Sequence, residues 1–331
     1  MALLSLLVNR ALHAIATMVV MALFAFALMN TLGDPVQNMA GPEFSAADRE
    51  ALRAELGLDD PVIVRFASFL ADAARGDLGM SFQYRRPVVD LLMERLPGTL
   101  ELVIIAAGIS IGIGAAIGIY AAVRPRSIAT RLMLLGSLIG VSLPTFATGT
   151  LLIFAFAVVL PIFPAFGRGE TVTIGCCWET GLLTASGLKA LVLPGITLGL
   201  FQLGMVLRLM RSEMREVLRS DFVRYARARG LSERSVVFVH ALRSASLPLI
   251  TVAGINLAGL IAYSLITETV FQWPGLGLLF IQAVQFADVP VLAAYLVFVS
   301  FLFVTINLVV DTLYGVVDPR IRAGTRAGAA G

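Results

Sequence analysis

One stretch of the chain has the spacing of a serine nucleophile. Gly108, Ser110 and Gly112 spell Gly-x-Ser-x-Gly, which in hydrolases holds the serine on a sharp turn between a strand and a helix. Here the stretch lies inside a long apolar run, and His13 is the only histidine in another such run that could act as its base. Glycines four residues apart also let two helix backbones approach closely in lipid. We therefore favour packing over hydrolysis.

Residues for nucleotide hydrolysis or metal binding are missing as well. A P-loop needs a lysine after its glycine-rich turn, and the sequence before Lys189, the only lysine, does not fit. Cys176 and Cys177 are adjacent, and with His13 and His240 they form no four-ligand zinc set of ordinary spacing. We expect no catalytic residue, metal or cofactor here. The cysteines are two small apolar side chains, which we favour, or a strained vicinal bridge.

Composition indicates the surroundings in which these residues must act. Of 331 residues, 58% are hydrophobic and 14% are charged, and the mean hydropathy is +0.88. A soluble domain carries about 25% charged residues, so the chain has too little polar surface to cover a globule. The net charge of +3 is arginine split among short loops, which indicates membrane orientation and argues against nucleic acid as a partner. The sequence predicts an all-α integral membrane protein.

Six apolar stretches are long enough to cross a bilayer, which takes about 20 residues. They are residues 11–32, 100–123, 132–160, 188–210, 249–271 and 291–313. The third contains Pro144, which predicts a kink or a tilt. Arginines gather in segment 124–131, in segment 211–243 and after residue 314, so both termini are expected in the cytoplasm.

Segment 33–98 is then external and predicts a small helical cap. Ser45 is the expected start of a first helix that ends at Gly57. A second helix is expected over 61–74 and a third over 87–96, before Pro97-Gly98. We divide the chain into residues 1–98 (first span and cap), 99–320 (five-helix core with a cytoplasmic loop, 211–248) and 321–331 (flexible tail).

Polar residues within spans are costly and therefore suggest either function or a satisfied bond between helices. Glu268 and Asp311 are the most costly. The candidates are Asn30, Glu101, Gln202, Asn256, Glu268, Asn307 and Asp311. Close helix packing is expected at the small residues of spans two and three, namely Gly108, Gly112, Gly114, Gly118, Gly136 and Gly140.

The cytoplasmic segment 211–248 is the most informative part of the sequence. Ser220 can cap a helix over 221–229, Gly230 can end it, and Ser232 can cap another that runs toward Pro248. Leu218, Phe222 and Tyr225 recur at helical spacing between arginines. Two short helices joined at a glycine predict a rigid cytoplasmic knob. A basic helix lying on anionic lipid is an equally good interpretation of the pattern.

The same segment resembles the cytoplasmic "EAA" loop of ABC-importer permeases, and in particular that of the dipeptide/oligopeptide/nickel group. The matching residues are 221–232, 240–243 and 247–248. Further matching segments are 33–35, 55–59, 76–79, 267–277, 307–311 and 318–322, so that the resemblance covers nearly the whole chain. One departure is that the signature begins Glu-Ala-Ala, whereas this chain has Arg224-Tyr225-Ala226.

The resemblance implies a permease subunit in the bacterial inner membrane, with ATP and Mg²⁺ bound by partner subunits. Those partners are two P-loop ATPases, a second and usually different permease, and an external substrate-binding protein. The segment that contacts an ATPase is expected to comprise Phe222, Arg224, Tyr225, Ala226, Arg227, Ala228, Arg229, Gly230, Leu231 and Ser232. An external gate or pathway is expected to use Glu268, Trp273, Pro274, Gly275, Asn256 and Asp311.

The alternative is a stand-alone, ion-coupled secondary transporter that uses the acids in the spans as ion sites. That hypothesis leaves the glycine-jointed basic knob unexplained. The cargo does not follow from the sequence, because permeases of this group look alike whether the system carries dipeptides, oligopeptides, glutathione or nickel.

Overall fold

A computed structural model describes residues 2–31, 45, 47, 50, 60–175 and 178–317. The described residues form two compact units. Unit 1 comprises Met1–Pro97 and Leu278–Thr305, and unit 2 comprises Gly98–Gly277 and Ile306–Gly331. Most of the helix expected between Ser45 and Gly57 lies outside the described residues, as do Cys176 and Cys177.

Four helices in the described part of the chain are long and apolar enough to cross a membrane. They coincide with the first, second, fourth and sixth predicted spans. These helices are α1 (Ala2–Thr31), α5 (Val88–Val123), α8 (Ala185–Arg219) and α13 (Val289–Val317). The fifth predicted span falls within α11 (Leu242–Phe271), whose described apolar stretch, Asn256–Phe271, is shorter than a full crossing.

The third predicted span is broken rather than merely kinked. Helix α6 (Ile128–Ser142) ends before Pro144, and α7 (Thr145–Ile153) continues into the π-helix η1 (Phe154–Val159). The two parts meet at 111°. Pro144 has no N–H to donate, and it forces the residue before it out of the helical region. A proline at this position therefore begins the new helix α7.

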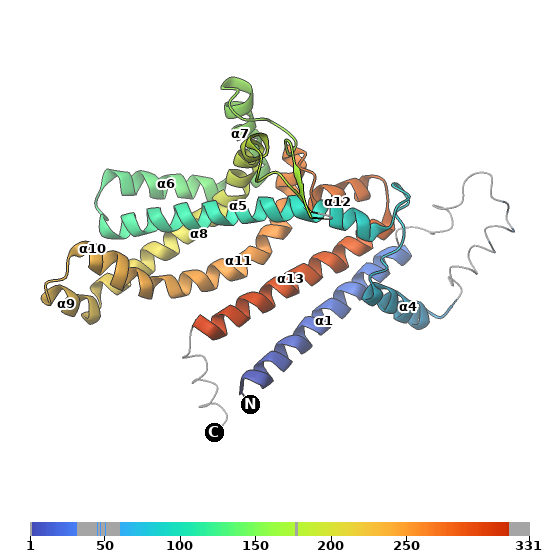
Figure 1. The fold of residues 1–331 in the computed structure, drawn as a ribbon, viewed down its shortest axis with the longest axis horizontal. Coiled ribbons are helices and arrows are strands. Elements are labelled where there is room, and N and C mark those ends of the chain that lie inside the picture. Colours follow the sequence, from blue (N-terminus) through green and yellow to red (C-terminus); the bar gives the residue numbers. More distant parts are fainter. Residues whose placement is uncertain are drawn as a thin grey trace. The chain divides into compact units, whose positions relative to one another are not determined.

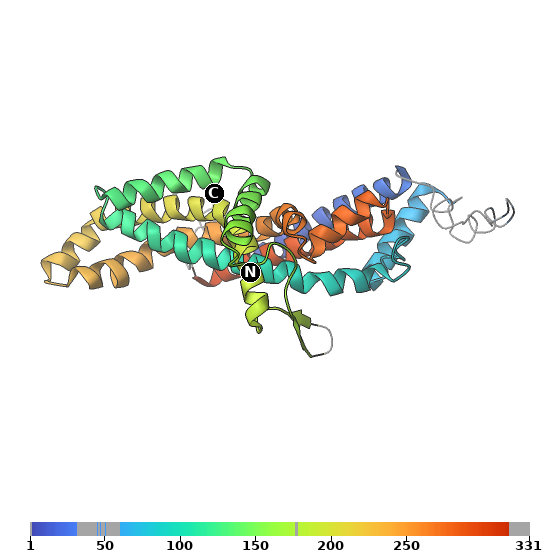
Figure 2. The same ribbon diagram turned by 90° about the horizontal axis from the view of Figure 1, so that it is seen from above.

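Helix α8 is the central element of unit 2. It packs against α6, α7 and α11, and Figure 1 shows α5, α6, α8 and α11 side by side. After α8 come α9 (Asp221–Ala228), α10 (Glu233–Ser235) and the π-helix η2 (Val236–Ala241), which leads into α11. Figure 2 shows the tan-coloured α9 and α10 beyond one end of α8.

The glycines expected to pack helices differ in what they meet. A Cβ built on Gly114 would lie 2.9 Å from Val206 Cγ1, and one on Gly118 would lie 2.8 Å from the carbonyl oxygen of Leu207. These two let α5 approach α8. Gly140 has only an ordinary contact, at 3.5 Å from Leu200 Cδ2. The packing expected at the other three has no contact within 4 Å in this chain to support it; they are Gly108, Gly112 and Gly136.

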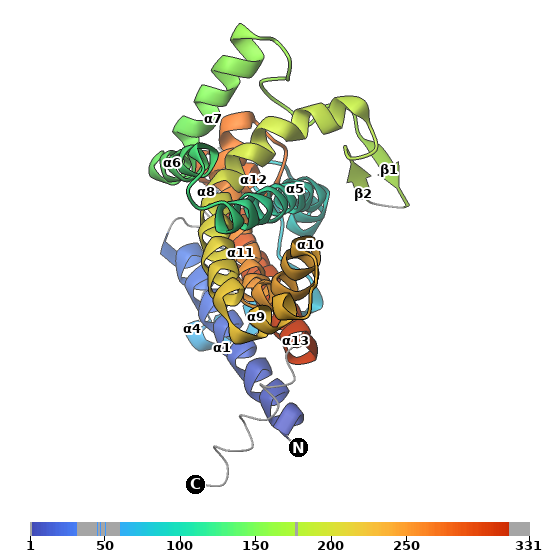
Figure 3. The same ribbon diagram turned by 90° about the vertical axis from the view of Figure 1, so that its left-hand side faces the viewer.

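One expectation about local structure is wrong, and the all-α prediction holds with a small addition. The helix expected to end before Pro97 continues through it as α5. Proline is tolerated inside membrane helices where neighbouring segments pack around it, and the Trp273–Pro274 turn packs here: a Cβ on Gly98 would lie 2.6 Å from the carbonyl oxygen of Pro274. The described residues are mostly helical, with one short hairpin. Strands β1 (Val172–Ile174) and β2 (Trp178–Thr180) form an antiparallel hairpin, seen to one side of α5 in Figure 3.

In unit 1, part of the predicted cap packs on α1. Helix α4 (Val62–Arg75) ends at Gly76, whose φ of +85° is left-handed, as expected. Phe26 of α1 contacts Phe66 and Phe69, with ring centroids 5.4 and 6.0 Å apart. Helix α12 (Leu276–Gln285) begins at the end of unit 2 and leads to the turn before α13.

A pair of glycine substitutions tests the packing of α5 on α8. Gly118→Ala should lower the thermal unfolding midpoint in detergent, because its Cβ would lie 2.8 Å from Met210 Cβ and overpacking costs about 1–3 kcal/mol. Gly108→Ala adds a methyl where no atom lies within 4 Å. It should leave the midpoint unchanged or raise it, since alanine favours helix over glycine. Equal shifts in the two variants would contradict the assigned contact.

Candidate coupling surface and buried acid clusters

Helix α9 has one face buried in protein and one face exposed. Val223 is 0% and Ala226 is 5% exposed, and both belong to an apolar cluster with residues of α5, α8, η2 and α11. Other members of the cluster are Ala122, Met210, Met214, Val236, Val237, Ala241, Ala245 and Leu249. The inward face of α9 is therefore fixed to the long helices on either side of it.

The outward face of α9 carries aromatic and basic side chains. Phe222 is 55% and Tyr225 is 66% exposed. The Phe222 ring stands edge-on to His240 of η2, at 5.9 Å between centroids. Arg224, Arg227 and the other predicted contact residues are also exposed, except Ala226. An exposed aromatic surface rimmed by arginines is typical of a protein-docking site.

The joint after α9 is held by its own hydrogen bonds. Gly230 has a φ of +81°, and its N–H donates to the carbonyl of Arg227 at 2.9 Å. The guanidinium of Arg227 forms two bonds to Glu233, of 2.8 and 3.3 Å. Ser232 Oγ accepts from the N–H of Ser235 and caps α10. The knob predicted from the sequence is thus present, with its cap at Ser232 and its joint at Gly230.

At the other end of α11, Glu268 is buried in a polar cluster. It is 0% exposed and accepts hydrogen bonds from Thr99 Oγ1 at 2.7 Å and from Ser264 Oγ at 3.0 Å. A Cβ on Gly275 would lie 2.5 Å from Glu268 Cδ. Trp273 is 0% exposed, and its indole N–H donates to the Gly98 carbonyl at 2.9 Å. The turn after α11 is therefore fastened to α5.

Four of the six predicted gate or pathway residues come together in this Glu268 cluster: Glu268, Trp273, Pro274 and Gly275. Asn256 lies elsewhere along α11, where its Nδ2 donates to the Val252 carbonyl at 2.7 Å and lies 3.7 Å from Met205 Sδ. The side chain of Asp311 lies outside the described residues. Ser110 is buried, and its hydroxyl donates to the Ala107 carbonyl in its own helix, which favours packing over nucleophilic catalysis.

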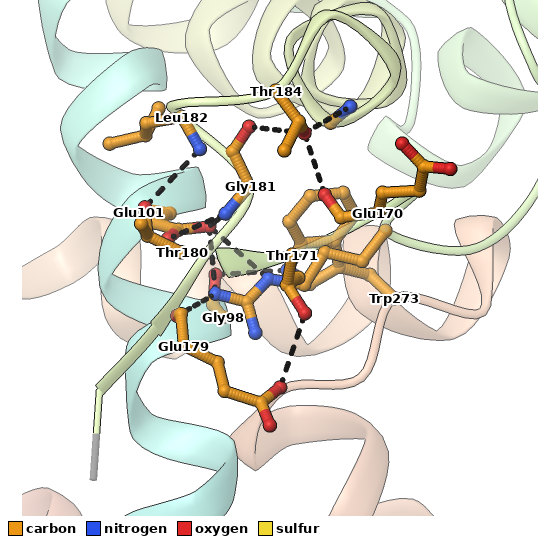
Figure 4. Close-up of polar contacts among 12 residues, drawn as sticks. Gly98, Glu101, Glu170, Thr171, Glu179, Thr180, Gly181, Leu182, Thr184 and Trp273 are labelled. Carbon is orange, nitrogen blue, oxygen red and sulfur yellow. Dashed lines mark hydrogen bonds and ion pairs between the residues drawn. The ribbon is translucent and has the colours of Figure 1, made fainter. Parts of the chain in front are cut away.

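A second buried carboxylate, Glu101, forms an ion pair that sequence reasoning missed. Its Oε2 lies 2.9 Å from Arg168 Nη2, and the two side chains are 2% and 6% exposed. Arg168 also donates to the Glu179 carbonyl at 2.7 Å, and the Gly181 N–H donates to Glu101 (Figure 4). The pair fastens the β1–β2 hairpin to α5. A lone arginine in loop 161–187 and a lone acid at one end of the second span were the only sequence signal for it.

A third carboxylate, Asp288 of unit 1, was also missed. It is 1% exposed and accepts hydrogen bonds from Ser81 Oγ at 2.5 Å and from the N–H groups of Phe82 and Gln83 at 3.2 Å. It thereby holds the loop between α4 and α5 against the turn before α13. The sequence gives no signal for this bond, since the partners are about 200 residues apart.

Comparison with known proteins identifies the family. The model of the family described as "Binding-protein-dependent transport system inner membrane component" matches residues 114–323, and the model of its N-terminal region matches 3–103. The chain belongs to this family. It is therefore a permease, and it is a multi-pass membrane protein with several apolar helices. A family of transport components is consistent with a role that is not enzymatic.

The permease is similar to curated proteins over nearly its whole length. It is 39% identical to a putative peptide transport system permease protein of Brucella abortus (strain 2308), covering 96% of this chain and 99% of the relative. It is 37% identical to the dipeptide transport system permease protein of Escherichia coli (strain K12), covering 93% and 96%. The glutathione transport system permease protein of Escherichia coli O6:H1 (strain CFT073) is also 37% identical, with 95% and 98% covered.

Among solved structures, the permease shares a fold with a chain of the MetNI methionine ABC transporter in an inward-facing conformation. The TM-score is 0.52, and the match covers 69% of this chain and 96% of that chain. The sequence identity is 20%, so the likeness shows the fold alone.

Removal of Arg168 should destabilise the permease strongly. Arg168→Leu leaves the Glu101 carboxylate buried without its partner, at 2% exposed, and losing one side of a buried pair costs about 3–5 kcal/mol. The thermal unfolding midpoint in detergent should fall, and adding Glu101→Gln should recover part of the loss. Arg75→Leu is the control, because Arg75 pairs with Asp72 at the surface at 3.7 Å and such pairs contribute about 0–1 kcal/mol. A midpoint no lower in Arg168→Leu than in Arg75→Leu would refute the clamp.

Proposed function

We propose that this permease is one of two membrane subunits of an ATP-driven importer for peptides or similar small solutes in the bacterial cytoplasmic membrane. The names of the relatives (peptide, dipeptide and glutathione transport permeases) support this cargo class. The importer would comprise two permeases of different sequence, two P-loop ATPases and an external substrate-binding protein. ATP and Mg²⁺ would be bound by the ATPases, and this chain would bind neither.

The observation that carries the proposal is the two-sided burial of α9. Val223 and Ala226 are held in the apolar cluster, while Phe222 and Tyr225 are more than half exposed. A helix that lay on lipid would turn its whole apolar face to the membrane. In α9 the apolar side chains of Val223 and Ala226 instead pack against other helices of the same chain. The exposed face then fits a groove of an ATPase subunit, with Phe222 to Ser232 as the contact segment.

The mechanism requires α9 to move with the long helices. When two ATPases close on ATP, each would displace the knob seated in it. From Glu233 onward, α10, η2 and α11 follow one another without a break. A displacement of the knob would therefore reach the Glu268 cluster at the far end of α11. The proposed gate at Glu268 and the Trp273–Pro274–Gly275 turn would then open outward. Partner-driven closure of this kind is alternating access between two states.

This mechanism needs six spans with both termini in the cytoplasm. The broken pair α6–α7 and the helix α11 would be the third and fifth spans. The cap and the β1–β2 hairpin would face outside, where the binding protein delivers its ligand. Arginine-rich segments 124–131 and 211–243 support this orientation, since positive charge is retained on the cytoplasmic side.

Co-purification tests the assembly. The chain, tagged at its C-terminus, is purified from native membranes in several mild detergents, and the proteins bound to it are identified by mass spectrometry. A second permease and P-loop ATPases in comparable amounts are expected. Recovery of the chain alone in every detergent would contradict the importer and favour the ion-coupled transporter, with Glu268 and Asp311 as the residues to test.

Gly230→Val tests the coupling joint. Valine at a φ of +81° costs about 1–2 kcal/mol in the left-handed region, so α9 should be tilted. ATP-driven uptake by the reconstituted importer should fall at least about fivefold, the change that about 1 kcal/mol gives, while the protein remains in the membrane.

The matched control is Gly76→Val in the cap. Gly76 has a φ of +85°, and at Gly76 as at Gly230 an added Cβ would have no atom within 4 Å. Gly76→Val should retain the stimulation of ATP hydrolysis by the loaded binding protein, which Gly230→Val should lose. Normal uptake by Gly230→Val would exclude the coupling role.

A further inference from the structure

A cavity of about 340 Å³ lies in unit 2 beside the break between α6 and α7. Its walls come from the turn at Pro144, from α8 and from α11, and they include Ser142, Gln202, Met205, Asn256 and Tyr263. Small-molecule sites begin at about 300 Å³. Non-helical backbone at membrane depth is tolerated where it is buried in protein or lines a cavity that water can enter. The break between α6 and α7 would therefore be tolerated at membrane depth if water or a ligand fills this cavity.

Gln202 supplies a hydrogen-bond donor in the wall of this cavity. Its side chain is 4% exposed, and among the described residues its Nε2 has no hydrogen-bond partner. A buried polar group without a partner costs about 1–3 kcal/mol. An amide nitrogen can only donate, so the group that would satisfy it is an acceptor such as a carbonyl or carboxylate oxygen.

The remaining walls are apolar or adaptable. Phe201 of α8 and Tyr263 of α11 form a tilted ring pair with centroids 6.3 Å apart. Met205 is flexible and polarisable, and such side chains accommodate ligands of varied shape. Asn256 is held to its own helix by its bond to the Val252 carbonyl. The walls are mainly apolar, with Ser142, Thr145 and Asn256 as further polar residues. One unpartnered donor in such a wall suits a ligand with a constant polar group and variable side chains.

Farther along α8, a row of arginines lies on a different side of the helix from Gln202. Residues 198, 201, 202 and 205 line the cavity, and a second hollow of about 650 Å³ is lined by Arg208, Arg211, Ser212, Arg215, Glu216 and Arg219. At 3.6 residues per turn, Arg211 lies half a turn around the helix from Gln202, and four arginines against one glutamate leave this hollow positively charged. A solute with a free carboxylate would meet this positive row next as it moves toward the end of α8 that carries α9.

We infer that this cavity is a peptide-binding subsite of the translocation path, in which the Gln202 amide donates to the carbonyl oxygen of the peptide bond. The inference rests on the proposed function, because it requires peptide cargo. The peptide bond is the group that all such cargo shares, and the aromatic and methionine walls accept differing side chains. The arginine row would guide the terminal carboxylate toward the cytoplasm.

The test compares two probes in the importer reconstituted in liposomes with its binding protein. The first is radiolabelled glycyl-leucine, and the second is its analogue with the peptide carbonyl reduced to CH₂. Gln202→Leu removes the donor at similar volume. Uptake of glycyl-leucine should fall about fivefold relative to wild type. This is the change that corresponds to the net loss of one hydrogen bond, about 1 kcal/mol. With the reduced analogue the two proteins should transport at equal rates.

Taking the ratio of variant to wild type for each probe cancels the selectivity of the binding protein. Thr197→Val is the control on the same helix, since the Thr197 hydroxyl donates to the Leu193 carbonyl within α8; it should match wild type with both probes. ATP hydrolysis stimulated by the binding protein should persist in Gln202→Leu, which separates a lost contact from lost coupling.

Each other outcome overturns a defined claim. If wild type and Gln202→Leu take up glycyl-leucine equally, the subsite is wrong and the importer function stands. If the variant loses the same fraction with both probes, Gln202 acts structurally and the carbonyl contact is wrong. If the wild-type importer moves neither glycyl-leucine nor radiolabelled glutathione, both the proposed peptide cargo and the subsite are wrong.

Discussion

A polar group within a bilayer must find its hydrogen bonds inside the protein, because lipid tails offer none. This constraint explains the main features of the permease. Glu268 is satisfied by Thr99 and Ser264, and Glu101 is satisfied by Arg168 and the Gly181 N–H. In each case a satisfying group comes from a different segment, so the carboxylate also fixes a loop to a helix. Among the described residues, Gln202 Nε2 and Thr267 Oγ1 are buried exceptions within the long helices, and Gln202 is the one of the two that lines a cavity.

In the proposed mechanism, motion is transmitted between two fixed ends of one helix. The knob is fixed to α8 and α11 through Val223 and Ala226, and the turn after α11 is fixed to α5 through Trp273 and Thr99. Between them α11 runs over 30 residues. Under that proposal, a force on the exposed aromatic side chains of α9 would reach the opposite end of the helix as a tilt or a shift, because packed helices move as rigid bodies.

Local signals in the sequence were enough for much of the fold. Apolar runs predicted the long helices, and Ser220, Gly230 and Ser232 predicted the knob, because caps and left-handed glycines act within a few residues. Pro97 misled, since the effect of a proline depends on whether a distant turn packs against its helix. The Glu101–Arg168 pair and the Asp288 bonds join residues 67 and about 200 positions apart, and no local pattern specifies such partners. The cavity beside Pro144 likewise depends on three helices meeting.

Helix α8 takes part in three of these arrangements at once. One face admits Gly114 and Gly118 of α5, another lines the cavity at Gln202, and its last turns lead into α9. A substitution that moves α8 at one of these contacts also moves it at the other two, since a rigid helix cannot adjust its sides separately. If the cavity is the proposed cargo subsite, substitutions that alter cargo are easier to accommodate on α11 and on the turn at Pro144, which line the same cavity without packing against Gly114 and Gly118.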